Sequence, residues 1–382
     1  MQQLISENGA KKYELVVNYR SKANIVSVAN QWASQIPNRL KDTPIIAKDP
    51  TDGNIQIVQY GQTNLITPLV ESIKATELAG STCVLTGTND EAAQITALLT
   101  KDGYAAKLIQ SNDGFNLCNL QELRFFTDFV NRNGDSPIIS HEDWTDGIRE
   151  LNQQFQNSNK LEWCRIIIKA FELSNPARKY KSDWKAYLSE SKFEDFIQIN
   201  GETIYVSTIH KAKGKEFDNV FVVLAKFDAE ADECKRQLYV AMTRAKDNLS
   251  IQYTQDFLST LVANQLTYTK DMVNYEAPKY MTCLLTHRNV YLGYFAFVQR
   301  RMLDIYAGMP LIIKEEGLAK ANGELLIRLS NKFKESALSY EANGYRMKWA
   351  SINFSVFWKN PDNNEEVQIL LPEVTFEKIT TE

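Results

Sequence analysis

The sequence is poor in cysteine and histidine, the two residue types that most often cross-link a chain or bind zinc. It has five cysteines and three histidines in 382 residues, and the cysteines are scattered without any CxxC spacing. An odd, scattered set argues against a disulfide framework and against a zinc site, and it is typical of a reducing compartment. His141 and His287 have no candidate ligands near them in the sequence, which favours structural roles. We therefore expect a cytoplasmic protein without a bound metal of its own.

Long hydrophobic runs are also missing. Runs such as 220–225 and 369–371 fall far short of the roughly 20 residues that a helix needs to cross a bilayer. Residues 1–10 have neither the basic start nor the apolar core of a secretion signal. The net charge is −4, so any contact with nucleic acid must come from a local basic groove rather than from the whole surface. We expect no contact with a membrane.

What the sequence does contain is enough chain for two or three domains. In residues 1–116 short apolar strands alternate with helical stretches, and this pattern returns in 201–269. Such an alternation is typical of an α/β domain with a parallel sheet. Residues 117–200 are rich in aromatic side chains and predicted to be helical, so they interrupt the α/β domain as a short insertion.

The remaining chain is predicted to form a separate small domain. Residues 270–279 are interpreted as a linker, and 280–382 as an α+β unit with a strand at 290–297 and a helix at 331–342. Aromatic side chains alternate with basic ones in this unit. Such a pattern can form a groove for single-stranded nucleic acid, but at alternating strand positions it is also typical of a core.

Residues 206–223 carry the densest set of candidate functional side chains. They read Val-Ser-Thr-Ile-His-Lys-Ala-Lys-Gly-Lys-Glu-Phe-Asp-Asn-Val-Phe-Val-Val. A strand would deliver Thr208 and His210 to a loop around Gly214, and a second strand would leave it. Glycine permits a backbone path that lets amides approach a phosphate closely, and three lysines (Lys211, Lys213 and Lys215) add positive charge. The alternative is a solvated basic loop between two buried strands.

Residues 234–251 form the second candidate segment. They read Cys-Lys-Arg-Gln-Leu-Tyr-Val-Ala-Met-Thr-Arg-Ala-Lys-Asp-Asn-Leu-Ser-Ile, a predicted helix followed by a strand. Arg244 falls near the end of the helix. There a guanidinium can complement the helix dipole, or it can stabilise the charge that develops on a phosphate during transfer.

The third segment is Val17-Asn-Tyr-Arg-Ser, which precedes a predicted helix at 23–32. Ser21 is a candidate N-cap, which would leave Tyr19 and Arg20 in a loop at the helix N-terminus. There Tyr19 could stack on a base and Arg20 could pair with a phosphate.

In their residues and in their order along the chain, these three segments resemble motifs IV, V and VI of the UvrD/Rep/PcrA family of superfamily 1 DNA helicases. The resemblance covers about residues 13–253. It implies an α/β, RecA-like second motor domain that faces a first motor domain across ATP. By position, the family assigns Tyr19 to the adenine, Arg20 and the backbone of Gly214 to the γ-phosphate, Glu216 to the ribose, and Arg244 to the arginine finger.

The same resemblance implies contacts with DNA. Thr208, His210 and the neighbouring Lys211 would touch a single strand, or the strand at a junction with duplex DNA. The family also implies 3′-to-5′ polarity. One loop would then contact both polymer and nucleotide.

The sequence departs from the family in two ways. It contains no GxxxxGK[ST] loop and no DExx strand end, which such a motor needs for its phosphates and Mg²⁺. We therefore expect the phosphate loop and the Mg²⁺ ligands on a first motor domain N-terminal to this chain, and the chain alone to be inactive. The insertion at 117–200 is also shorter than the family's usual 2B domain.

Two functions remain open from the sequence. The first is the C-terminal half of an ATP-dependent DNA helicase or translocase, with a docking site for a partner protein as one role for 280–382. The second is a non-catalytic adaptor that kept the fold and binds DNA or protein.

Overall fold

The computed structural model describes residues 13–37, 39, 41, 43–109, 115–132, 134, 136–196, 199–361 and 363–379. The chain divides into two compact units, and each is made of two stretches of sequence. Unit 1 comprises Met1–Ile109 with Ile199–Pro278, and unit 2 comprises Gln110–Gln198 with Lys279–Glu382. Among the described helices, not one has the length and apolar character that crossing a bilayer requires.

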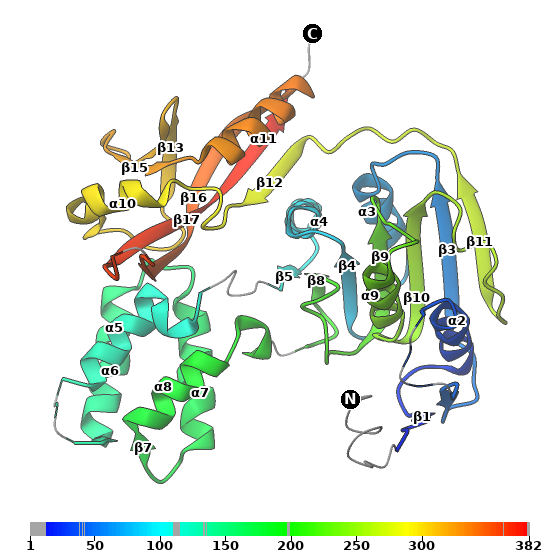
Figure 1. Ribbon diagram of the computed structural model, residues 1–382, viewed down its shortest axis with the longest axis horizontal. Coiled ribbons are helices and arrows are strands. Elements are labelled where there is room, and N and C mark those ends of the chain that lie inside the picture. The colour runs from blue at the N-terminus through cyan, green and yellow to red at the C-terminus, as the bar shows by residue number, and fades with distance from the viewer. Residues whose placement is uncertain are drawn as a thin grey trace. The chain divides into compact units, whose positions relative to one another are not determined.

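Unit 1 is built on a seven-stranded sheet in which every pair of neighbouring strands runs parallel (Figure 1). The predicted α/β class is confirmed, and the sheet is consistent with a RecA-like domain. From edge to edge the strands are β11 (Leu266–Asp271), β3 (Asn54–Tyr60), β10 (Ala245–Thr254), β9 (Phe217–Leu224), β4 (Thr82–Thr86), β8 (Ile204–Thr208) and β5 (Ala106–Leu108).

Helices cover both faces of this sheet. One face packs its apolar side chains, among them Val84 and Val223, against α3 (Ile66–Ala75) and α4 (Asn89–Lys101). On the other face lie α2 (Ala23–Ala33) and α9 (Asp232–Met242), which contact each other and the central strands. A short parallel pair, β1 (Val17–Asn18) and β2 (Ile46–Ala47), lies outside the sheet.

Helix α4 shows how local sequence sets the element bounds. Thr88 caps its start by accepting a hydrogen bond from the Glu91 amide, and the Glu91 side chain accepts one from the Thr88 amide. Gly103, with φ +88°, follows its end. Glycine suits the end of α4, because only glycine enters this backbone region without strain.

The strand β11 corrects the predicted linker. Lys270 pairs with Gln59 of β3 inside the sheet, so the interval 270–279 begins within a strand. Among the described strands β11 pairs only with β3, which leaves it at the edge. Its side chains are largely exposed, and the apolar signal that marks an internal strand is therefore weak.

The first stretch of unit 2 is helical, as predicted. Four fully buried aromatic rings form its core, with Phe126, Trp144 and Trp184 in mutual edge-to-face contact at 5.0–5.5 Å between ring centroids and Phe171 beside them. The helices are η1 (Leu117–Asn119), α5 (Gln121–Val130), α6 (His141–Gln154), α7 (Leu161–Ser174), α8 (Lys181–Glu190) and η2 (Phe193–Phe196), with the short strands β6 (Ile138–Ile139) and β7 (Lys179–Tyr180).

The second stretch of unit 2 forms an antiparallel sheet with short helices, which agrees with the predicted α+β character. The strand order is β12 (Tyr280–Leu284), β17 (Glu366–Lys378), β16 (Tyr345–Lys359), β13 (Pro310–Lys314), β14 (Gly317–Ala319) and β15 (Leu325–Arg328). The helices are α10 (Leu292–Val298), η3 (Gln299–Met302) and α11 (Asn331–Ala342).

The strand predicted at 290–297 is wrong. Residues 292–298 form helix α10, and only Val290 makes an isolated bridge, to Leu329. The buried residues here are Phe295, Val298 and Met302, a spacing of three and four that belongs to a helix. The many aromatic side chains in this stretch hide the helical spacing in the sequence.

The two stretches of unit 2 are joined through a buried lysine. The Lys160 ammonium donates a hydrogen bond to Asn353 Oδ1 at 2.9 Å and lies 4.3 Å from the centroid of the Phe354 ring. An ion pair between Arg124 and Glu366 (3.0 Å) and a bridge between Leu120 and Val356 extend the contact. The insertion therefore packs on the C-terminal strands, an arrangement that the sequence alone did not predict.

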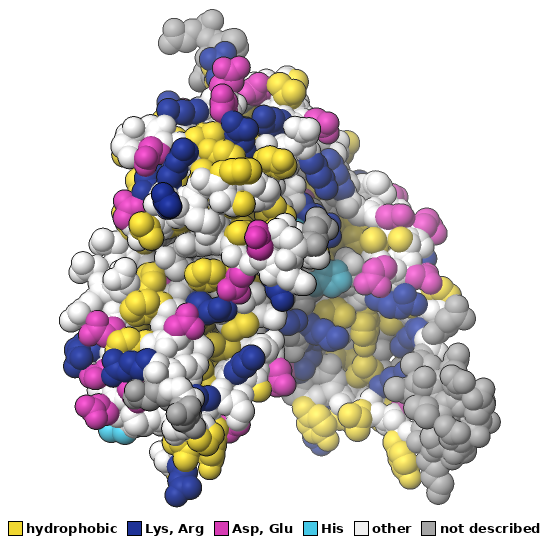
Figure 2. Space-filling model, turned by 60° about the vertical axis from the view of Figure 1, so that its left-hand side comes forward, with side chains coloured by type: hydrophobic (Ala, Val, Ile, Leu, Met, Phe, Trp, Pro, Cys, Tyr) yellow, Lys and Arg dark blue, Asp and Glu magenta, His cyan; other side chains and the backbone are white. Residues whose placement is uncertain are grey.

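Charges are mixed on the surface. On the face shown in Figure 2, Lys and Arg side chains are interspersed with Asp and Glu. This is the surface expected for a chain whose net charge is −4.

The buried lysine makes unfolding pH-dependent. Burial is the main cause that lowers the pKa of Lys160 to about 8, while the charges of Glu373 and Glu122 oppose it. A lysine whose pKa is depressed by folding destabilises the fold below that pKa, and this penalty is relieved as pH rises from about 8 toward 10.5. We expect the free energy of unfolding of the wild type to rise by roughly 1–3 kcal/mol over this range, relative to a Lys160→Met variant.

Urea unfolding of both proteins between pH 7 and pH 10 measures this difference. Other titrating groups are common to the two proteins and cancel. Equal pH slopes in the two proteins would show that the ammonium is not destabilised by burial.

Candidate functional site

The parallel register between β9 and β10 brings two of the candidate segments together. Ala245, the first residue of β10, pairs with Phe217, the first residue of β9, and the Phe217 amide donates to the Arg244 carbonyl at 3.0 Å. Glu216 and Arg244 are the residues immediately before this pair. They therefore lie side by side at the amino-terminal edge of the sheet.

Hydrogen bonds hold the third segment, residues 17–21, at the same edge of the sheet. The amides of Arg20 and Ser21 both donate to Asn18 Oδ1, at 2.7 and 2.9 Å, which holds the turn after β1. Ser21 Oγ donates to the Ala245 carbonyl at 2.7 Å. The prediction that Ser21 caps α2 is wrong: the N-cap is Lys22, and the Ser21 hydroxyl bonds the start of β10 instead.

Arg20 lies across the two strand starts. Its guanidinium forms an ion pair with the Glu216 carboxylate and donates to the Thr243 carbonyl at 3.0 Å. Its Nε is buried and has no hydrogen-bond partner among the described residues. One donor of the fork therefore remains available for an acceptor that the described residues do not supply.

Arg244 occupies the other side of this cluster. Its Nε donates to the Val240 carbonyl at 3.0 Å in the last turn of α9, and its Nη1 donates to the Lys215 carbonyl at 3.2 Å. The capping role that the sequence allowed is thus present. Burial first, and then the nearby charge of Arg20, lower the pKa of Arg244, whereas the charge of Glu216 acts in the opposite direction.

We call Arg20, Glu216 and Arg244 the arginine cluster. Two guanidiniums and one carboxylate leave it with an excess of one positive charge. Because the two cations repel each other in a partly buried place, a bound anion would be stabilised there. The chemistry of the cluster is that of an anion receptor with forked donors.

Gly214 lies in the loop that leads to this cluster. Its φ is +87°, and a Cβ placed on it would meet no atom within 4 Å. The backbone conformation, rather than crowding, therefore requires glycine. The empty space beside it leaves the backbone accessible to a ligand.

The loop 209–216 runs from one edge of the sheet to the other. It leaves the carboxyl end of β8 after Thr208 and reaches the amino end of β9 at Phe217, and β4 lies between these two parallel strands. A five-residue strand spans about 16 Å. The DNA-binding residues predicted from the sequence thus lie at the opposite edge from the arginine cluster.

At that far edge the side chains differ in exposure. Thr208 is buried, and His210 is exposed. Lys211 Nζ donates to Asn89 Oδ1 at 2.7 Å, next to the start of α4. Ile209 and Ala212 are buried and anchor the loop to the sheet.

Tyr19 is exposed, with 80% of its surface accessible. The sequence missed Asn18 and Asn89, which position Arg20 and Lys211. Asn18 had a readable signal, since asparagine just before a turn often accepts backbone amides. Among the described residues there is no group of three or more His, Cys, Asp or Glu side chains that could hold a metal ion.

Two family models match stretches of this chain. Models of the UvrD-like helicase C-terminal domain match residues 13–140 and residues 203–251. Together these matches include every residue of the arginine cluster and of the loop 209–216. A search of curated proteins found no match.

Among solved structures, the C-terminal domain of a possible DNA helicase from Lactobacillus plantarum WCFS1 is 13% identical, with a TM-score of 0.30; the alignment covers 66% of this chain and 98% of that one. VirB4 of Thermoanaerobacter pseudethanolicus is 12% identical, with a TM-score of 0.21, over 84% of this chain and 89% of that one. At these TM-scores neither similarity supports a conclusion. From the two family matches, this chain carries sequence of the UvrD-like helicase C-terminal domain.

Proposed function

We propose that this chain is the second motor half of an ATP-dependent 3′-to-5′ DNA helicase or translocase. A first motor domain, carrying the phosphate loop and the Mg²⁺ ligands, would complete its nucleotide site. The UvrD-like family matches support the helicase half. The polarity rests on the resemblance of the motifs alone.

The observation that carries this proposal is the arginine cluster. It draws Arg20, Glu216 and Arg244 from three segments that are far apart in sequence, and it concentrates positive charge in a partly buried place. The buried Nε of Arg20 has no acceptor among the described residues, and the backbone at Gly214 faces open space. These features fit a terminal phosphate, which offers several acceptor oxygens and negative charge.

Each residue of the site has a proposed task. ATP, when bound with Mg²⁺, supplies the phosphoanhydride bond whose hydrolysis drives movement. Arg244 and Arg20 stabilise the charge that develops on the transferring phosphoryl group, and Gly214 offers its backbone. Glu216 holds the Arg20 guanidinium in place before nucleotide binds and then accepts the ribose hydroxyls. Tyr19, exposed beside Arg20, stacks on the adenine.

The loop 209–216 provides the coupling. Its anchors, Ile209 and Ala212, are buried, so its two ends respond together rather than independently. Nucleotide binding at one end would shift the equilibrium of the other end, where Thr208, His210 and Lys211 meet the single strand. Closure on ATP thereby changes the grip on DNA.

A second candidate function also has an observation in its favour. The hydrogen bonds of Arg244 to the Val240 and Lys215 carbonyls are sufficient for a purely structural cap. A non-catalytic adaptor that binds DNA or protein would need Arg244 for nothing more. Measurements of ATP hydrolysis distinguish the motor from the adaptor.

We expect Arg244→Ala to abolish DNA-stimulated ATP hydrolysis in a protein extended to include the first motor domain. An arginine finger typically contributes about 10³- to 10⁵-fold in turnover. Arg244→Lys should recover little, because an ammonium lacks the fork. Turnover of ATP with and without single-stranded DNA is the measurement, and the melting temperature of each variant reports structural damage.

Arg236→Ala is the matched control. Arg236 lies on α9, the helix that precedes Arg244, is exposed, and pairs at 3.8 Å only with Asp232 among the described residues. Its loss should leave turnover unchanged. Full turnover by Arg244→Ala, or turnover by the 382-residue chain alone, would contradict the proposed role.

Gly214→Ala gives an independent test against Gly103→Ala. The two glycines have nearly the same φ (+87° and +88°), and an added Cβ would meet no atom within 4 Å at either position. Each variant should lose about 1–2 kcal/mol of stability from backbone strain. Only Gly214→Ala should also lose ATP turnover, because only its backbone faces the nucleotide.

Urea unfolding and ATP hydrolysis on the extended protein measure the two effects. If turnover falls equally in both variants, strain alone explains the loss and Gly214 has no special place in the site.

A further inference from the structure

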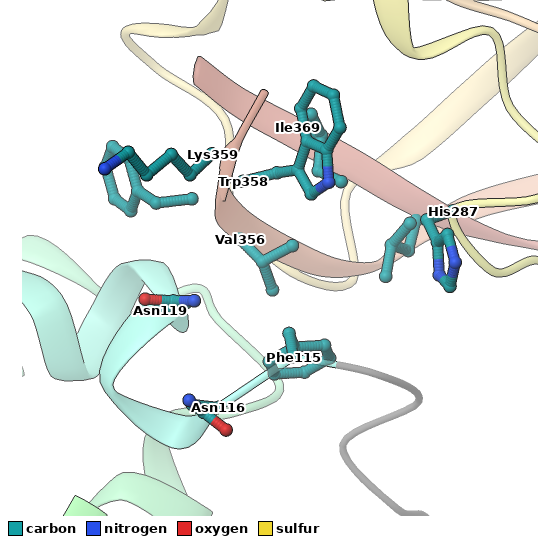
Figure 3. A pocket seen from close by; sticks show the side chains of 10 residues that line it. Phe115, Asn116, Asn119, His287, Val356, Trp358, Lys359 and Ile369 are labelled. Carbon is teal, nitrogen blue, oxygen red and sulfur yellow. The ribbon is translucent and has the colours of Figure 1, made fainter. Parts of the chain in front are cut away.

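Unit 2 contains a pocket outside the arginine cluster and outside the loop 209–216. It opens between the short helix η1 and the hairpin of β16 and β17, and its volume is about 170 Å³ (Figure 3). This is less than the few hundred cubic ångströms typical of a drug-sized ligand. The pocket has room for one small planar ring system.

Aromatic and aliphatic side chains form part of its walls. Figure 3 shows Phe115 rising from the helical side toward Val356, while Trp358 and Ile369 come from the hairpin. The Phe115 ring is held in place by contact with the Phe354 ring, with 5.2 Å between the ring centroids. A flat ligand would therefore meet aromatic and aliphatic faces that are already in place.

Polar side chains stand around these walls. Asn116, His287, Trp358 and Lys359 are among the residues that line the pocket. Within the described part of the chain, no hydrogen bond or ion pair is formed by any of these four side chains. They can donate and accept hydrogen bonds at the edge of a planar ligand, and Lys359 can pair with an adjacent negative charge.

We infer that this pocket receives one base of a single DNA strand. Aromatic faces bind any base by stacking, amide and imidazole groups bind its edge, and a lysine beside them binds the backbone phosphate. The inference rests on the proposed function, because a motor that tracks along a single strand supplies this ligand. It adds a second contact with the strand, on a different unit from the loop 209–216.

A strand fits the pocket better than a free nucleotide does. The lining contains a single lysine and no arginine, which is too little charge for a di- or triphosphate. The nearby Arg124 is already paired with Glu366. A strand needs only one phosphate contact here, since its other contacts lie elsewhere.

Binding of a fluorescent oligothymidine to the 382-residue chain tests the inference. We expect Trp358→Ala and Phe115→Ala each to weaken binding by roughly 5- to 150-fold, the range for loss of one stacked base. Trp358→Phe should retain most of the affinity, since a ring remains. Trp349→Ala is the matched control, because Trp349 lies on the same strand β16, is half exposed and does not line the pocket.

Photo-cross-linking of the wild-type chain to a strand containing 5-bromouracil gives a readout that needs no variant. Adducts on Phe115 or Trp358 are expected, and excess thymidine monophosphate should not prevent them. Adducts confined to unit 1, unchanged affinity in Trp358→Ala, or no binding of the strand by the wild-type chain would each overturn the inference. So would competition by the free nucleotide at equal concentration. ATP turnover in the extended protein is measured separately, so failure of the pocket and failure of the proposed motor are distinguishable.

Discussion

The parallel register between β9 and β10 is the constraint on which the candidate site depends. Pairing of Ala245 with Phe217 places the two preceding residues, Arg244 and Glu216, next to each other without any direct bond between them. Arg20 then bridges the gap, held by the turn at Asn18 and by the bond from Ser21 to the Ala245 carbonyl. A shift of one residue in this register would turn Glu216 away from Arg20 and dissolve the cluster.

Many residues of the candidate site could be predicted from the sequence, but their geometry could not. The motifs around Arg20, Gly214 and Arg244 contain enough characteristic residues to identify the family. The periodicity of unit 1 predicts a parallel sheet. The contacts within the cluster depend on strand order, which joins β9 to β10 and separates β8 from β9 by β4. No local pattern encodes that order. Ser21 illustrates the limit, since its hydroxyl serves a distant carbonyl rather than its own helix.

Unit 2 was harder to predict, for a related reason. Its two stretches are separated by the second stretch of unit 1, and the interactions that unite them, such as Lys160 with Asn353 and Phe354, have no signature in either stretch. A lysine after an asparagine in a helical region looks solvated until its tertiary partners are known. His287 is a similar case: it looked structural in the sequence, yet it lines a pocket in the folded unit.

The interleaving of the two units has a consequence for synthesis on the ribosome. The chain passes from one unit to the other after Ile109, after Gln198 and after Pro278, so each unit waits for a stretch that is made later. Strands β3 and β4 emerge long before β9 and β10, which must insert between them. The usual order, in which an N-terminal domain folds before the next is made, is therefore closed to this chain. Its aromatic helical stretch must persist without its partner strands until nearly the last residue has been added.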